Sequence, residues 1–163
     1  MKIYELSVSH RVNAPLEKVF DFFSKPENLS KITPKKMGFN VLTPLPITME
    51  RGALIDYTIK VMGFPLRWRT LITSYDPPNK FVDEQLKGPY SFWHHTHTFE
   101  SVNDGVIIND VIKYSIPLGF IGRIMHFLWI KNDLNKVFNF RKKVIDEIFL
   151  KNKAFENSKE NMS

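Results

Sequence analysis

The sequence of 163 residues contains no cysteine. Disulfide bonds, thiolate metal sites and thiol nucleophiles are therefore excluded, and the absence is compatible with a reducing compartment. The first five residues, Met1 to Glu5, lack the apolar core of a secretory signal peptide. We therefore expect a cytoplasmic protein.

Long apolar runs are also missing. The longest, residues 116–130, is interrupted by Arg123 and His126 and is shorter than the roughly 20 residues that a membrane-spanning helix needs. We therefore expect a soluble chain. Two interpretations of residues 120–130 remain open: burial under the edge of the fold, or a gate that touches a membrane transiently, assisted by Arg123 and Lys131.

Several functional motifs are absent as well. The sequence has no phosphate-binding loop, no Ser-His-Asp order and no RNA-binding motif. The formal charge of +6 suggests anionic partners, but the lysines are scattered, and the densest cluster, residues 141–143, is interpreted as a solvated helix face. Because the aromatic residues fall on predicted core faces, we expect no nucleic-acid partner.

Aromatic residues, by contrast, are plentiful. They make up 13% of the chain, and fourteen of them are phenylalanine. Packing one domain of this length does not require so much aromatic surface, so a roomy apolar interior is indicated. We expect a single domain over residues 1–150 and a polar, frayed tail over 151–163.

Alternation of apolar and polar residues predicts an antiparallel sheet of six to seven strands. Hairpin and turn signals, Asp76 to Asn79 and Asn103 to Gly105, separate some of these strands. Two short helices are predicted after the first strand, and apolar residues three and four apart predict a long helix over 120–150. The expected class is α+β, with this helix lying across a curved sheet. The predicted strands cover residues 2–12, 37–42, 54–62, 66–75, 81–86, 88–100 and 106–115.

The strand over 88–100 carries the main candidate site. Side chains at alternate positions share a face, so Trp93, His95, His97 and Phe99 lie together. Asp83 and Asp110 occupy inward positions of other strands, and buried histidines and carboxylates need partners. We therefore expect His–Asp pairs.

Three uses of these pairs remain open. In the first, the pairs form a hydrogen-bonded network that stabilises the sheet. In the second, they contact a ligand. In the third, they are catalytic, with His95 or His97 as the base and Asp83 or Asp110 orienting that base. The same groups are usable metal ligands, but a His-x-His pair alone is common. We expect no metal and no cofactor.

A compound pattern of residues runs along nearly all of 1–150: Ala14-Pro15, Val19-Phe20, Trp68 to Ile72, Phe81 to Gln85, Gly88 to Tyr90, Trp93, His95, His97, Phe99, Asp110, Tyr114, Pro117, Gly119, Phe138 and Arg141. This pattern resembles the START-like, or Bet v 1-like, SRPBCC superfamily of helix-grip proteins. Within it, the chain is similar to a bacterial ligand-binding subgroup related to polyketide cyclase/dehydrase-like proteins. The resemblance implies a hydrophobic ligand cavity and carries over no catalytic residue.

These observations favour a binding protein over an enzyme. The expected partner is a small hydrophobic molecule (a lipid, a quinone or a polyketide-like aromatic) held between the sheet and the C-terminal helix. The alternatives are a cyclase or dehydratase that uses a His–Asp pair, and a protein-interaction module without a ligand. The residues expected to line the cavity are Tyr57, Trp68, Asp83, Trp93, His95, His97, Phe99, Asp110, Tyr114, Phe127, Leu134 and Phe138.

Overall fold

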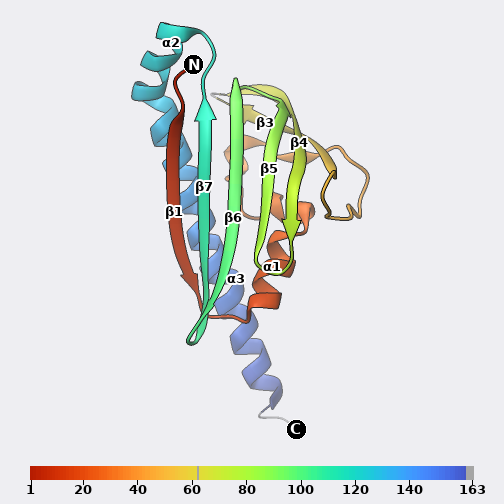
Figure 1. The fold of residues 1–163 in the computed structure, drawn as a ribbon. Coiled ribbons are helices and arrows are strands. Elements are labelled where there is room, and N and C mark those ends of the chain that lie inside the picture. Colours follow the sequence, from red (N-terminus) through yellow and green to blue (C-terminus); the bar gives the residue numbers. More distant parts are fainter. Residues whose placement is uncertain (62, 161–163) are drawn as a thin grey trace.

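A computed structural model describes residues 1–61 and 63–160 and shows a curved antiparallel sheet with a long helix along one face (Figure 1). The seven strands follow the order β1-β7-β6-β5-β4-β3-β2, so the first and last strands of the chain lie side by side. The predicted α+β helix-grip class is confirmed. The strands are β1 (Tyr4–Val12), β2 (Asn40–Val41), β3 (Leu54–Val61), β4 (Phe64–Asp76), β5 (Lys80–Lys87), β6 (Phe92–Val102) and β7 (Gly105–Ser115).

The helices fall into two groups. Helix α1 (Leu16–Phe23) and the 3-10 turns η1 (Pro26–Ser30) and η2 (Lys35–Met37) follow β1. The C-terminal group is α2 (Gly119–Met125), a π-helical turn η3 (His126–Ile130) and α3 (Lys131–Glu160). In Figure 1, α3 passes behind the sheet, and α1 lies at the end where the β6–β7 hairpin turns.

The side chains of β6 alternate between buried and partly buried, as the sequence predicts. Trp93, His95, His97 and Phe99 are buried, whereas the residues between them are only partly buried. The hairpin that follows turns at Asp104 and Gly105, both at positive φ, as its Asn-Asp-Gly sequence predicts. This turn aligns His97 with Asp110 across the β6–β7 pair.

Two apolar clusters hold the helices against the sheet. One joins α1 to α3 and the sheet, and Phe20 packs edge-on against Phe99 at 5.3 Å between ring centroids. Ile145 of α3 belongs to this cluster and is 2% exposed. The second cluster lies further along the sheet and contains Trp68, Trp93, Ile112, Tyr114 and Phe138.

The C-terminal helix differs from its predicted bounds. It extends to Glu160 rather than ending near Leu150. The added residues contain neither glycine nor proline, so nothing in their sequence ends a helix. Residues 161–163 of the expected tail lie outside the described residues, and the domain boundary at 150 stays a prediction.

The segment between β7 and α3 is not buried under the fold. Seven large apolar side chains between residues 118 and 129 are exposed, and Phe127 reaches 81%. The burial considered for this segment is therefore wrong, and membrane contact stays a prediction. None of the helices formed by the described residues combines the length and apolarity that crossing a bilayer requires.

The packing of α3 on the sheet gives a first prediction. Ile145→Ala should lower the free energy of unfolding by about 2–5 kcal/mol, because it removes a buried side chain and leaves a cavity. Urea unfolding followed by circular dichroism measures this loss. Leu150→Ala, on the same helix at a position 66% exposed, is the control and should cost far less. Equal losses would contradict the described packing.

Candidate functional site

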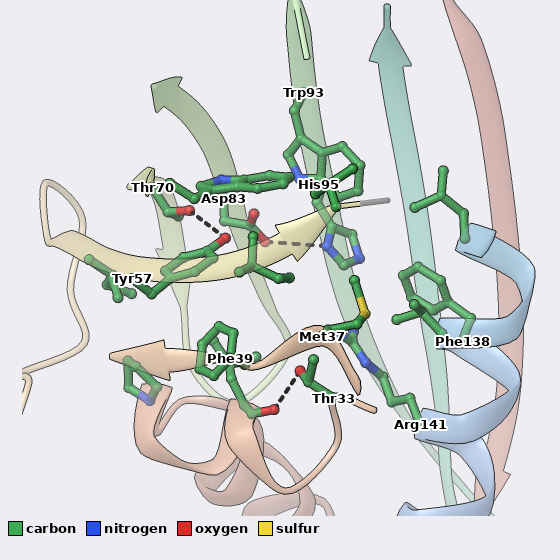
Figure 2. Close-up of a pocket in the computed structure, with 18 of the residues that line it drawn as sticks. Thr33, Met37, Phe39, Tyr57, Thr70, Asp83, Trp93, His95, Phe138 and Arg141 are labelled. Carbon is green, nitrogen blue, oxygen red and sulfur yellow. Dashed lines mark hydrogen bonds and ion pairs between the residues drawn. The ribbon is translucent and has the colours of Figure 1, made fainter. Parts of the chain in front are cut away.

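A cavity of about 290 Å³ lies between the sheet, α3 and the segment from α1 to β2. This volume is just below the roughly 300–1,000 Å³ typical of ligand pockets. Figure 2 shows the cavity with Phe138 and Arg141 of α3 on one side and Tyr57 and Thr70 on the other. Met37 and Phe39 close a third side.

Aromatic rings form most of the wall. Trp68 of β4 stacks on Tyr57 of β3 at 5.8 Å between ring centroids, and its edge meets Trp93 of β6 at 5.2 Å. The ring centroid of Tyr90 lies 4.8 Å from that of Trp93. Edge-to-face and offset pairs of this kind are favourable beyond the area they bury, and aromatic side chains have few rotamers. The wall is therefore apolar and rigid.

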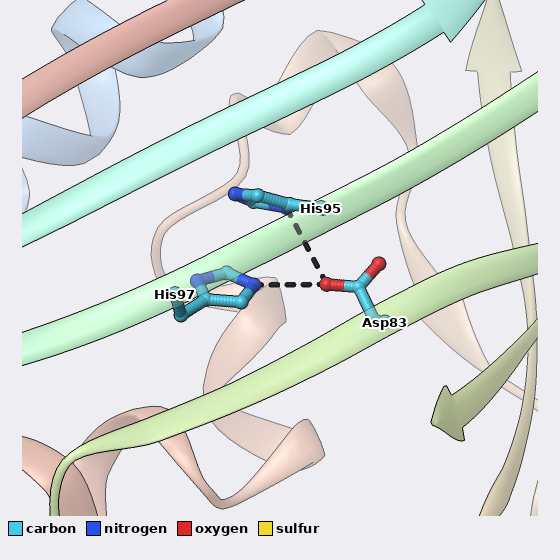
Figure 3. Close-up of side chains that lie close together, drawn as sticks. All are labelled: Asp83, His95 and His97. Carbon is cyan, nitrogen blue, oxygen red and sulfur yellow. Dashed lines mark hydrogen bonds and ion pairs between the residues drawn. The ribbon is translucent and has the colours of Figure 1, made fainter. Parts of the chain in front are cut away.

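The floor of the cavity is polar. His95 donates from Nε2 to Asp110 Oδ1 at 3.0 Å, and His97 donates from Nε2 to Asp83 Oδ2 at 2.8 Å. The two rings lie 3.7 Å apart between centroids. Figure 3 shows that both histidines also face the same oxygen of Asp83, which lies 3.4 Å from His95 Nδ1.

Asp110 also contacts both rings. Its Oδ1 lies 2.7 Å from His97 Nδ1, a charge contact whose angle is not that of a hydrogen bond. Register explains the arrangement, because His95 lies directly opposite Asp83 and His97 lies directly opposite Asp110 in the sheet. The two expected His–Asp pairs are thus one four-residue cluster.

Burial and mutual charge set the protonation of this cluster. Burial lowers the pKa of His95, and the neighbouring His97 lowers it further, which outweighs both carboxylates. Burial also opposes charge on His97, but its contacts with Asp110 and Asp83 raise the pKa above the ordinary value. The histidines in turn hold the pKa of Asp83 low, and that of Asp110 well below its usual range, against the effect of burial. The two histidines therefore differ in proton affinity.

Arg141 is a further charged group that lines the cavity, as do Lys36, Lys60 and Asp133. Its side chain extends from α3 into the cavity in Figure 2, and the guanidinium lies 4.7 Å from the ring centroid of Phe138. Its Nε and Nη1 are buried and have no hydrogen-bond partner among the described residues. Such donors are costly to leave unpaired.

The structure separates the residues expected at the cavity into two groups. Tyr57, Trp68, Asp83, Trp93, His95, His97, Leu134 and Phe138 line it. Asp110 lies behind the histidines, and Phe99 packs against α1. The hydroxyl of Tyr114 is hydrogen-bonded to His126 Nε2 at 2.9 Å, near the end of the sheet away from the β6–β7 hairpin. Phe127 is exposed. Whether the first group contacts a ligand stays a prediction.

Sequence reasoning missed many of the wall residues, and Met37, Phe39 and Arg141 show two different reasons. The strand predicted over 37–42 is wrong in its bounds, because Met37 ends the 3-10 turn η2 and β2 covers only Asn40–Val41, so Met37 and Phe39 line the cavity. The sequence predicts that Arg141 belongs to a solvated basic cluster, but Arg141 lines the cavity. Its spacing from Leu134 and Phe138, seven and three residues, places all three on one helix face and could have identified it.

Comparison with known proteins identifies the fold. No protein-family model matches the sequence, and no curated protein matches it. Solved structures do match. TTHA0849 from Thermus thermophilus is 15% identical with a TM-score of 0.68, covering 90% of this chain and 97% of that one. Major latex-like protein 151 from Panax ginseng is 10% identical with a TM-score of 0.67, covering 91% and 98%.

A third similar structure is the di-domain ARO/CYC StfQ from the steffimycin biosynthetic pathway. It is 12% identical with a TM-score of 0.69, and the match covers 93% of this chain and 52% of StfQ. This chain therefore spans about half the length of StfQ. Identities this low show the fold alone. The chain has the helix-grip fold of Bet v 1-like proteins, so the resemblance stated from the sequence is confirmed for the fold.

The floor cluster gives a second prediction. Asp110→Ala should lower the free energy of unfolding by about 3–5 kcal/mol, because it leaves two buried histidines without their shared partner. Glu84→Ala is the control. It removes the partly exposed ion pair between Glu84 and His94 on the opposite face of the sheet and should cost about 1 kcal/mol or less. Urea unfolding at neutral pH measures the free energy of unfolding of both variants. If Asp110→Ala loses as little as Glu84→Ala, the floor adds little to stability.

Proposed function

We propose that the protein binds a small, mainly apolar molecule in the cavity between the sheet and α3, and that this molecule carries an acidic or strongly accepting oxygen. The apolar part of the molecule packs against Tyr57, Trp68 and Trp93. Arg141 binds the oxygen. The observation that carries the proposal is the pairing of this aromatic wall with buried guanidinium donors that have no partner among the described residues.

The volume narrows the class of ligand. A cavity of about 290 Å³ accommodates a molecule of one or two rings more readily than a long acyl chain. Of the three classes expected from the sequence, a polyketide-like aromatic or a quinone therefore fits better than a lipid. That StfQ is an ARO/CYC of a biosynthetic pathway is consistent with an aromatic ligand.

Tryptophan fluorescence provides the test. Trp68 and Trp93 line the cavity, whereas Trp129 is half exposed, so a Trp129→Phe background limits the signal to the two cavity residues. Titration with 2-naphthoic acid and with 2-naphthamide compares an acidic and a neutral probe of the same shape. We expect saturable quenching and tighter binding of the acid.

Substitution of Arg141 separates the polar contact from the apolar one. Arg141→Gln should weaken binding of the acid by about 10- to 150-fold, the range of one charge-assisted hydrogen bond, and leave binding of the amide nearly unchanged. Lys142→Gln, an exposed neighbour on α3, is the control and should alter neither. If no probe of either kind quenches the cavity tryptophans, the proposal fails.

A second candidate function is enzymatic. The observation in its favour is that Asp83, His95 and His97 all face the cavity, which places a potential base beside a bound molecule. The reaction class would be proton abstraction beside a carbonyl, as cyclisation and dehydration of polyketide-like compounds require. Asp110, which accepts a hydrogen bond from His95 Nε2, would orient that ring as the base.

Proton exchange tests this candidate without knowledge of the substrate. Incubation of 2-tetralone in deuterated buffer, followed by NMR, reports abstraction of the protons next to the carbonyl. We expect faster exchange with the wild-type protein than with His95→Gln or His97→Gln, and no effect of His94→Gln on the outer face. Exchange at the rate of buffer alone would argue for binding without catalysis.

A further inference from the structure

Three potential metal-ligand atoms converge on the cavity floor. Asp83 Oδ2 lies 2.8 Å from His97 Nε2 and 3.4 Å from His95 Nδ1, and the ligand atoms of the three residues all lie within 4.8 Å of one another (Figure 3). Ligand atoms held about 2.0–2.1 Å from a tetrahedral zinc ion are about 3.3 Å apart. Small side-chain shifts would therefore let all three atoms bind one ion.

The backbone holds these side chains in place. His95 and His97 are alternate residues of the central strand β6, and Asp83 lies opposite His95 on β5. Sites built on paired strands are more rigid than sites on loops. The ring of His97 is further restricted by stacking on Phe81 at 4.1 Å between centroids.

Asp110 supplies the support that metal-binding histidines normally have. It contacts His95 at Nε2 and His97 at Nδ1, which are the two ring nitrogens that do not face Asp83. Histidines that bind metals almost always engage a carboxylate, carbonyl or water through the other nitrogen, which fixes the ring orientation. Here Asp110 lies at both of these nitrogens, with a hydrogen bond to His95 and a 2.7 Å contact to His97.

Charge and access also fit a metal ion. With neutral histidines, Asp83 and Asp110 contribute two negative charges, which a divalent ion balances. Asp83, His95 and His97 line the cavity, so a further coordination position would face the bound molecule. Sites with an open position and two histidines plus one carboxylate bind zinc in hydrolytic enzymes and iron(II) in oxygenases.

We propose that Asp83, His95 and His97 bind one divalent transition-metal ion at the floor of the cavity, with Asp110 positioning both imidazole rings. The sequence led us to expect no metal, because a His-x-His pair alone is common. The structure shows that Asp83 lies within reach of both histidines and that Asp110 contacts the opposite nitrogen of each ring. The inference does not depend on the identity of the organic ligand.

Metal titration of the wild-type protein is the primary test. The protein, free of any affinity tag and stripped with a chelator, is titrated with Zn²⁺ in competition with a chromophoric chelator. Co²⁺ serves as a spectroscopic probe. We expect one ion per chain, visible Co²⁺ absorption of a site with nitrogen and oxygen ligands, and a higher unfolding temperature with metal. Failure to bind Zn²⁺, Co²⁺ or, without oxygen, Fe²⁺ would overturn the proposal whatever the variants do.

Variants locate the ion. Asp83→Asn and His97→Gln should each abolish the Co²⁺ spectrum, and Asp110→Asn should weaken binding by about 10- to 100-fold. His94→Gln, the adjacent histidine on the outer face, is the matched control and should bind as the wild type does. Circular dichroism selects the variants that are folded. If folded Asp83→Asn or His97→Gln binds as the wild type does, the site lies elsewhere and the proposal is wrong.

These measurements use no organic ligand. Their failure would therefore leave the proposed binding of an apolar molecule untouched, and failure of the fluorescence titrations would leave the metal site standing.

Discussion

The buried carboxylate of Asp110 is the group on which the cavity floor depends. It is 5% exposed and contacts both His95 and His97. A carboxylate at this depth is stable only with partners of this kind, since its desolvation is otherwise uncompensated. The same contacts fix both ring orientations and direct the remaining ring nitrogens toward Asp83. One interaction therefore orders the polar floor of the cavity.

The cavity stays open for reasons that follow from its walls. Trp68, Trp93 and Tyr57 support one another through stacked and edge-on contacts, so none can turn inward to fill the space without losing these contacts. The floor opposes filling as well, because apolar side chains packed onto Asp83 and the histidines would desolvate them further. A rigid aromatic wall and a polar floor together favour an occupant that is apolar with one polar end. These features weigh against a protein-interaction module that lacks a ligand.

Much of the fold and of the floor was predictable because a strand alternates strictly. Alternation assigned Trp93, His95, His97 and Phe99 to one face and brought Asp83 and Asp110 toward them. It could not show how far along the strand the cavity reaches. Phe99 therefore shares the face but packs under α1.

The helical part was harder to predict for two physical reasons. The π-helical turn η3 interrupts the helical repeat at His126–Ile130, so the phase of α3 does not extend back to Phe127, which is exposed. Arg141 was misinterpreted because charged residues on a helix are normally solvated. Its long side chain instead stacks on Phe138 and carries the guanidinium into the cavity.

The position of Arg141 bears on the role of the whole site. It lies near enough to Asp83 to help lower the pKa of that carboxyl, yet its Nε and Nη1 bond to none of the described residues. A network that served stability alone would pair these donors, because unpaired buried donors cost free energy. An acidic group of a bound molecule would satisfy the guanidinium while its apolar part contacts the aromatic wall. Its polar end would then lie beside Asp83 and the histidines, where an oxygen could also reach an ion held by the floor. Ligand recognition by Arg141 and metal binding by the floor are thus compatible in one cavity.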